Sequence, residues 1–125
     1  MSKDNAYVTD ILRAAQAIRR FVAGVTKADF LSNEEKYEAV NRKFEIIGEA
    51  ARHLSPEAVK ALANVPWRKI VAMRNILIHA YDDVDLEVVW DTAQQQLPPL
   101  IAALEAHLAA SRPAGTEPID PNVKT

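Results

Sequence analysis

The chain has 125 residues, of which 49% are hydrophobic and 26% charged, a composition typical of one soluble globular domain. Its 15 basic and 17 acidic side chains give a net charge of −2, which excludes a polycation that coats nucleic acid. Because the chain contains no cysteine, disulfide scaffolds, thiol nucleophiles and cysteine-ligated zinc sites are excluded. No apolar run is long enough to span a bilayer, and the first residues lack the layout of a signal peptide. We therefore expect a cytoplasmic protein that does not associate with membranes.

Apolar residues recur at helical spacing in the first half of the chain, and no long stretch alternates with period two. This spacing predicts a helix over residues 4–23, followed by a connector over residues 26–31 with room for one helical turn. Ser32 and Glu35 match a capping box, which predicts that the second long helix begins there and runs to about Leu54.

The second half of the chain also carries clear helix boundaries. Ser55-Pro56 predicts a short helix, because serine caps helix starts and proline is tolerated at the first helical position. A further helix is predicted over residues 67–79. Acidic residues 82–85 favour the start of the last helix at Leu86. Its apolar stripe continues past Pro98-Pro99, so we expect one kinked helix at that point rather than two.

These elements predict an all-α fold, an antiparallel up-down helical bundle of four main helices plus a short helix. The helical domain is expected to cover residues 1–110. Residues 111–125 are rich in proline and poor in apolar side chains, so we expect a disordered C-terminal tail there.

Two histidines and two tryptophans have ordinary structural interpretations. His53 is predicted to cap the C-terminus of the second long helix, and His107 to be exposed near the end of the last helix. Trp67 and Trp90 are interpreted as core or interface aromatics rather than platforms for base stacking.

Charge is unevenly distributed along the chain. Residues 40–80 carry seven basic and three acidic side chains, whereas residues 81–125 carry two basic and eight acidic ones. The middle of the chain could therefore present a basic surface to a phosphate ligand. The alternative is that these charges lie on ordinary solvated helix faces.

The segment from Ile70 to Tyr81 is the most informative part of the sequence. Its large aliphatic residues are distributed around the helix, which predicts burial on most sides, yet it also contains Arg74, Asn75 and His79. A buried guanidinium is costly unless it is paired, so this helix needs a carboxylate partner or lines a wet cleft. Asn75 and His79 share a helix face, whereas Arg74 and His79 lie about 140° apart around the helix.

Structural explanations of these polar residues stay open at this point. Arg74 could pair with Glu49 on the neighbouring helix, and His79 could complement the dipole at a helix C-terminus. Tyr81 could be a partly buried aromatic side chain with its hydroxyl in water.

The segment Arg74-Asn75-Ile76-Leu77-Ile78-His79-Ala80-Tyr81 resembles the Arg-x4-His-x-Tyr motif of HepT-like toxins, members of the HEPN superfamily, once described as domain of unknown function 86. Three further blocks resemble the same family in the same order: Phe44 to Ala51, Pro66 to Ile70, and Val84 to Trp90 with the following Leu97-Pro98. The resemblance covers roughly residues 5–108. It implies an all-α dimer in which two copies of the motif helix face each other across a cleft.

The resemblance also implies a metal-independent RNA endonuclease that uses no cofactor. His79 would be the general acid/base, Arg74 would hold the scissile phosphate, and Asn75 would orient one of them. Glu49 would support this set, and no residue would bind a metal. Because a ribose 2′-hydroxyl would be the internal nucleophile, the substrate would be RNA and not DNA.

The implied biological role is the toxin of a type II toxin–antitoxin system. Its partner would be a nucleotidyltransferase antitoxin that transfers AMP to Tyr81 and so blocks RNA entry. The alternative is a non-catalytic HEPN dimer that serves as a binding or substrate subunit of the nucleotidyltransferase. Intact Arg74, Asn75 and His79 favour the nuclease, because a binding subunit has less need of all three.

Overall fold

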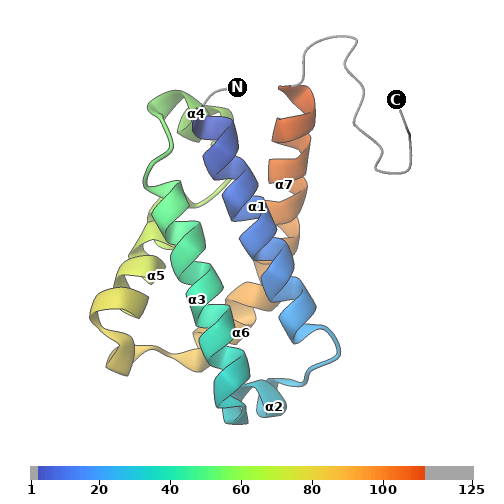
Figure 1. Cartoon of the computed structure of the whole chain (residues 1–125), viewed down its shortest axis with the longest axis vertical. Coiled ribbons are helices and arrows are strands. Elements are labelled where there is room, and N and C mark those ends of the chain that lie inside the picture. Colours follow the sequence, from blue (N-terminus) through green and yellow to red (C-terminus); the bar gives the residue numbers. More distant parts are fainter. Residues whose placement is uncertain (1–2, 112–125) are drawn as a thin grey trace.

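The computed structural model describes residues 3–111 and, within them, contains seven α-helices, one 3-10 helix and no strand (Figure 1). The helices are α1 (Lys3–Val22), α2 (Lys27–Ser32), α3 (Glu34–Ala51), α4 (Pro56–Ala61), α5 (Trp67–His79), α6 (Leu86–Gln95) and α7 (Leu97–Ala110), with the 3-10 helix η1 (Tyr81–Asp83) between α5 and α6. The predicted all-α fold is confirmed. The tail predicted for the C-terminus lies outside the described residues from residue 112 onward.

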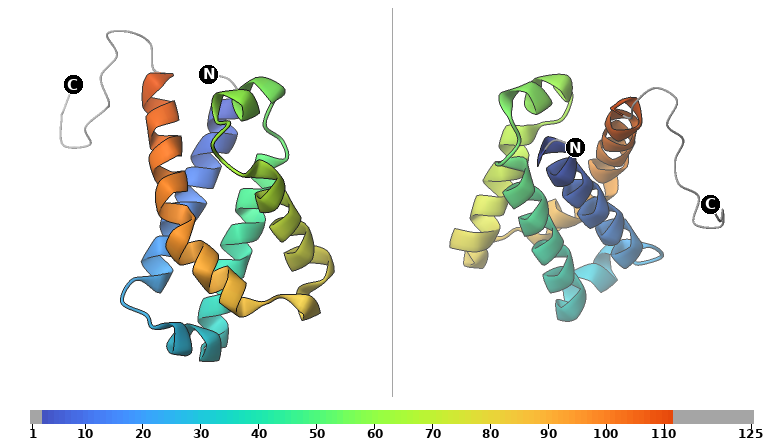
Figure 2. Two further views of the ribbon diagram at one scale, coloured as in Figure 1. Left: turned by 180° about the vertical axis from the view of Figure 1, so that it is seen from behind. Right: turned by 45° about the horizontal axis from the view of Figure 1, so that its top comes forward.

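The long helices alternate in direction, as expected for an up-down bundle. α1 and α3 form the central antiparallel pair, α5 packs on α3, and α7 packs on α1 (Figures 1 and 2). The short helices α2 and α4 lie at opposite ends of this pair. None of the described helices has both the length and the apolar character that crossing a membrane requires.

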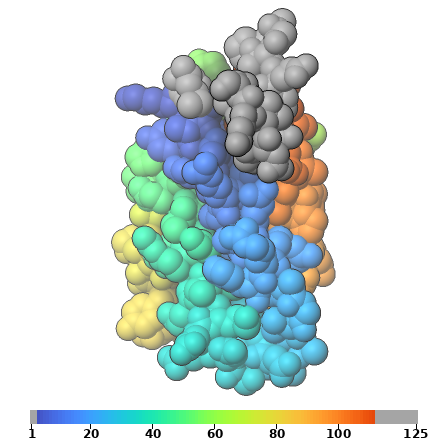
Figure 3. Space-filling model, turned by 45° about the vertical axis from the view of Figure 1, so that its right-hand side comes forward, coloured from blue at the N-terminus to red at the C-terminus, as the bar shows by residue number. Residues whose placement is uncertain are grey.

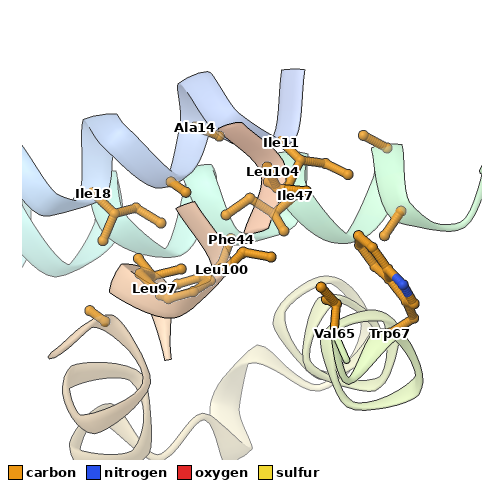
Figure 4. Close-up of a cluster of buried hydrophobic side chains, with 14 of the residues drawn as sticks. Ile11, Ala14, Ile18, Phe44, Ile47, Val65, Trp67, Leu97, Leu100 and Leu104 are labelled. Carbon is orange, nitrogen blue, oxygen red and sulfur yellow. The ribbon is translucent and has the colours of Figure 1, made fainter. Parts of the chain in front are cut away.

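The core lies between α1, α3 and α7, where side chains such as Ile11, Ile47 and Leu104 are fully buried (Figure 4). Trp67 enters this core from the start of α5, and its indole Nε1 donates a hydrogen bond to the carbonyl oxygen of Leu62 at 3.1 Å. The core interpretation of Trp67 is confirmed. α5 is therefore anchored to the bundle at its N-terminal end.

Two predicted helix boundaries hold and one is wrong. Ser55 caps α4, and Asp85 caps α6 by accepting from the backbone amides of Glu87 and Val88. The predicted cap at Ser32 is wrong, because Asn33 caps α3 with its side chain, which accepts from the Lys36 amide at 3.0 Å. The connector forms the helix α2, whose last residue is Ser32, so the Ser32 hydroxyl donates to the Ala28 carbonyl instead.

The last predicted helix is divided into α6 and α7, with Gln96 between them. Pro98 and Pro99 lie in the first turn of α7, where a missing backbone N–H leaves no helical hydrogen bond unmade. The chain therefore restarts a helix before the prolines rather than kinking at them.

Candidate functional site

The motif helix α5 has one face on the bundle and one face in solvent. Only Trp67 and Leu77 of this helix are buried, so the expectation that it is buried on most sides is wrong. The physical reason is that α5 packs mainly on α3, and no described helix covers its outer side (Figure 1). Seven residues of α5 are exposed, and Ile78 is one of them. We call the other six, which follow helical spacing, the outer face of α5: Arg68, Lys69, Ala72, Asn75, Ile76 and His79.

Arg74 lies on the opposite side of α5, against α3. Its side chain is only 15% exposed, and its Nη2 lies 2.9 Å from Glu49 Oε2. Its Nη1 donates to Asn75 Oδ1 at 2.9 Å. Within the described residues its buried Nε has no hydrogen-bond partner. Such an unpaired buried donor reduces the stability of a fold by about 1–3 kcal/mol. The guanidinium is thus held in place by a carboxylate from the neighbouring helix, as the structural alternative expected.

Gly48 allows this close approach of α3 and α5. A Cβ atom at Gly48 would collide with Arg74 Cβ, and it would lie 2.7 Å from Arg74 Cγ and 3.3 Å from the Ile70 carbonyl oxygen. Any side chain at position 48 would therefore push the Arg74 backbone away from α3. Sequence reasoning did not identify this role, although a glycine inside a helix is a recognisable signal of close packing.

Glu49 is the centre of a small charged cluster. Besides Arg74, it contacts Arg52 Nη1 at 3.4 Å and His53 Nε2 at 3.1 Å. The hydrogen bond with His53 lowers the pKa of the Glu49 carboxyl below its ordinary value; partial desolvation opposes this, and the charges of Arg52 and Arg74 add to it. Glu49 therefore stays ionised, which keeps Arg74 paired.

His53 has a different role from the one predicted. Arg52, not His53, is the C-cap residue of α3. The His53 ring contacts Glu49 and stacks on the Tyr7 ring, with the centroids 5.3 Å apart. The i, i+4 spacing of Glu49 and His53 was the available signal for this pair. The other histidine of the bundle body, His107, is half-buried on α7 rather than fully exposed.

The remaining motif residues are exposed and separate from Arg74. His79 is the last residue of α5, and Tyr81 opens η1 with 71% of its surface exposed. Among residues 3–111, neither side chain makes a hydrogen bond or an ion pair. A single chain therefore brings together Arg74, Asn75 and Glu49, but leaves His79 and Tyr81 facing solvent.

No group of three or more histidine or acidic side chains within the described part of the chain is placed to hold a metal ion. What the site offers chemically is a fixed guanidinium, an amide, an accessible imidazole and an accessible phenol on one helix and the turn that follows it.

Comparison with known proteins matches this chain to a family model. The model described as "Ribonuclease HepT-like" matches residues 11–107. The chain is 36% identical over 99 residues to "Probable ribonuclease HepT" of Thermococcus cleftensis, covering 79% of this chain and 90% of that protein. It is 34% identical over 100 residues to "Putative RNase MJ1380" of Methanocaldococcus jannaschii, covering 80% and 92% respectively.

A bacterial relative shows the same degree of likeness. "Putative RNase TTE0752" of Caldanaerobacter subterraneus is 33% identical over 100 residues, which cover 80% of this chain and 89% of that protein. No solved structure matches the chain at a significant level. The family match begins within α1, ends within α7 and includes the whole of α3, α5 and η1, which carry the site residues. The chain belongs to the HepT-like ribonuclease family.

Proposed function

We propose that this protein is a metal-independent endoribonuclease and acts as the toxin of a toxin–antitoxin pair. One observation carries the proposal: in a member of the HepT-like family, α5 holds Arg74 rigidly against Glu49 while it leaves His79 accessible at its end. The names of the relatives as ribonucleases support the same activity.

The chemistry uses the ribose 2′-hydroxyl of the substrate as the nucleophile. The His79 imidazole takes the 2′-hydroxyl proton, and the 2′-oxygen forms a bond to phosphorus while the bond from phosphorus to the 5′-oxygen breaks. A protonated imidazole gives a proton to the leaving oxygen, so the products are a 2′,3′-cyclic phosphate and a 5′-hydroxyl. An imidazole can accept a proton at one ring nitrogen and donate one when protonated, which suits both roles.

Arg74 and Asn75 serve the phosphate in this proposal. A planar guanidinium presents paired donors to phosphate oxygens and stabilises the charge that develops on them. Because Glu49 and the Asn75 amide already hold the guanidinium, little ordering is needed when substrate binds. Glu49 acts as a positioning residue, since it reaches the substrate only through Arg74.

A homodimer would complete the site. Arg74 and His79 lie about 140° apart around α5, so one copy of α5 does not direct both at a single phosphate. The outer face of α5 has an apolar centre in Ala72 and in Ile76, which is 47% exposed. A second copy packed on this face would cover Ile76 and place two sets of motif residues around one cleft.

Tyr81 is proposed as the AMP acceptor for a nucleotidyltransferase antitoxin. Its exposure makes the phenol accessible to a second protein, and only Ala80 separates it from His79. AMP is transferred from ATP: the phenol oxygen forms a bond to the α-phosphorus, the bond from the α-phosphorus to the oxygen bridging the β-phosphorus breaks, and pyrophosphate and the phenol proton are released. The adenylate adds negative charge beside His79, which would repel the RNA backbone.

Cleavage of total cellular RNA in excess chelator tests the nuclease directly. Wild type expressed without a partner should cleave, His79→Ala should not, and the matched control His107→Ala should cleave like wild type. Cleavage by His79→Ala would remove His79 from the mechanism. If neither protein cleaves and the intact mass shows no added AMP, the binding-subunit alternative is favoured.

Two further experiments test the dimer and the modification. Ile76→Ser should convert a dimer to a monomer in light scattering and reduce cleavage; a monomeric wild type would contradict the composite cleft. Tyr81→Phe should remain toxic when the antitoxin is present. If the antitoxin still neutralises this variant, AMP transfer to Tyr81 is not the mechanism.

A further inference from the structure

A groove of about 390 Å³ lies between α1 and α3, away from the outer face of α5. Three cationic side chains line it: Arg13 and Arg20 from α1, and Lys43 from α3. Its floor includes the buried Ala14 and Ala17, whose small side chains leave the space between the helices hollow. We call this feature the α1/α3 groove. Figure 3 shows this side of the molecule, with α1 between α3 and α7.

The cations of the α1/α3 groove are unpaired within the described part of the chain. Within residues 3–111, none of Arg13, Arg20 and Lys43 makes an ion pair or a side-chain hydrogen bond. By contrast, Arg19 donates to the Ala93 carbonyl oxygen and to Gln94, and Arg74 pairs with Glu49. The exposed Arg42 and Arg68 also lack an ion pair among the described residues, but they do not line the groove. Three unpaired cations around one hollow repel one another, and an anion in the hollow would relieve that repulsion.

The charge balance in the groove is the reverse of that of the chain. Asp10 is the single acidic residue in the lining, so the groove is net positive, whereas the whole chain carries −2. Asp10 also makes no ion pair with a described residue. A concave positive surface on a negative protein concentrates anionic ligands locally.

The cations form a row rather than a point. Arg13 and Arg20 are seven residues apart on one face of α1, which is about 10 Å along the helix axis. The polar side chain of Gln16 lies between them in the lining. A row of this length fits successive phosphates of a polynucleotide better than one small anion.

The groove is well placed to extend the proposed nuclease site. α3 lies between α1 and α5, so the α1/α3 groove and Arg74 flank opposite sides of one helix (Figure 1). Lys43 and Glu49 are six residues apart on α3, about 9 Å along its axis. A strand whose scissile phosphate contacts Arg74 could therefore cross α3 and reach the groove.

We propose that the α1/α3 groove binds the phosphate backbone of single-stranded RNA outside the cleavage site. This inference rests on the proposed ribonuclease function and extends it by a second contact region. The contacts are electrostatic, so they hold the substrate without reading its sequence. Arg13, Arg20 and Lys43 are binding residues here and take no part in bond cleavage.

The test measures RNA binding separately from cleavage. In the full-length His79→Ala protein, which is expected not to cut, the pair Arg13→Gln/Lys43→Gln is compared with the control pair Lys3→Gln/Lys60→Gln. Both pairs remove two positive charges, and Lys3 and Lys60 are exposed and lie outside the groove. Binding to a labelled single-stranded RNA is followed by fluorescence anisotropy between about 50 and 200 mM salt, with circular dichroism to confirm the fold.

The groove pair should bind more weakly and with a smaller salt dependence. Log affinity falls with log salt at a slope of about −0.7 per phosphate contact of a single strand, so the loss of two contacts makes the slope shallower by about 1.4. At low salt this corresponds to a loss of affinity on the order of 60-fold. The control pair should stay close to its parent, because its charges lie outside the contact region.

Three outcomes would overturn the inference. The first is an equal loss of RNA affinity in the groove pair and the control pair. The second is that the parent His79→Ala protein does not bind RNA at low salt. The third is that the groove pair loses binding to a labelled glutamate-rich peptide but keeps the RNA affinity of its parent. The last outcome would assign the groove to an acidic protein segment. Failure of this inference is distinguishable from failure of the nuclease proposal. If wild type cleaves RNA and the groove pair binds RNA as tightly as its parent, only the groove is rejected. If wild type does not cleave RNA and the groove pair binds it more weakly than its parent, only the nuclease is rejected.

Discussion

Gly48→Ala tests whether the close approach of α3 to α5 positions Arg74. Alanine inside a helix normally stabilises a protein by about 0.5–1 kcal/mol relative to glycine. Here the added Cβ would collide with Arg74 Cβ and lie 2.7 Å from Arg74 Cγ, and overpacking of this kind costs about 1–3 kcal/mol. We expect a net loss of about 1 kcal/mol in the free energy of unfolding.

The same substitution should have a larger effect on activity than on stability. Moving Arg74 outward separates its guanidinium from Glu49, which lies 2.9 Å away in the native protein. A misplacement of about 1 Å at a catalytic group reduces rates by about 10²-fold. The assay combines urea unfolding, which gives the free energy, with cleavage of RNA under conditions where each variant is folded.

Gly24→Ala is the matched control for this prediction. Gly24 has φ +72°, a left-handed conformation that costs an L-residue about 1–2 kcal/mol, but an added Cβ there would meet no atom within 4 Å. This variant should lose stability and retain cleavage. If Gly48→Ala instead gains about 1 kcal/mol and cleaves like wild type, the packing argument for Arg74 is refuted.

Three further predictions concern Glu49, Asp4 and Asn33. Glu49→Gln should reduce cleavage by about 10-fold or more with little change in stability, because the pair with Arg74 is half-exposed on the Glu49 side; unchanged cleavage would remove its positioning role. Hydrogen bonds from Ser55 lower the pKa of Asp4 below its ordinary 3.8, and the pKa of Glu49 lies below its ordinary 4.5. Both carboxylates therefore stabilise the fold fully above these values, and this stabilisation is lost as the pH falls through the lowered pKa values. The urea midpoint should decline less with falling pH for Asp4→Asn than for wild type, and parallel curves would contradict the assignment. Asn33→Ala should lower the free energy of unfolding by about 1 kcal/mol, and Ser32→Ala should lower it by less, as measured by urea unfolding. A larger loss for Ser32→Ala would indicate that Ser32 is the cap after all.

Helix positions in this protein follow from local chemistry, and the sequence alone predicts most of them. Ser55 and Asp85 cap helices through contacts two or three residues away, so their role can be inferred without tertiary structure. The capping error at Ser32 has the same origin. Ser32 and Asn33 are adjacent and chemically equivalent as caps, and the choice depends on α2, which packs on α3 and α6.

The candidate residues were also named from sequence, but their arrangement was not. The motif places Arg74, Asn75 and His79 on one helix, and the pair with Glu49 was one of two readings that the residues allowed. The tertiary structure selected that pair, because α3 and α5 meet at Gly48. Packing also left Ile76 and Ile78 of α5 exposed to solvent, where helical periodicity had suggested burial.

The all-α bundle, the order of its helices and the residues able to carry chemistry can be predicted from the sequence, since periodicity, caps and residue types are local properties. Which helix faces meet depends on tertiary packing. The tertiary structure closed the Glu49, His53 and Arg74 cluster and left Tyr81 exposed. It also brought Arg13 and Lys43, which are 30 residues apart in the chain, to one groove. Such contacts depend on how helices dock, and docking is set by the shape and burial of many side chains together.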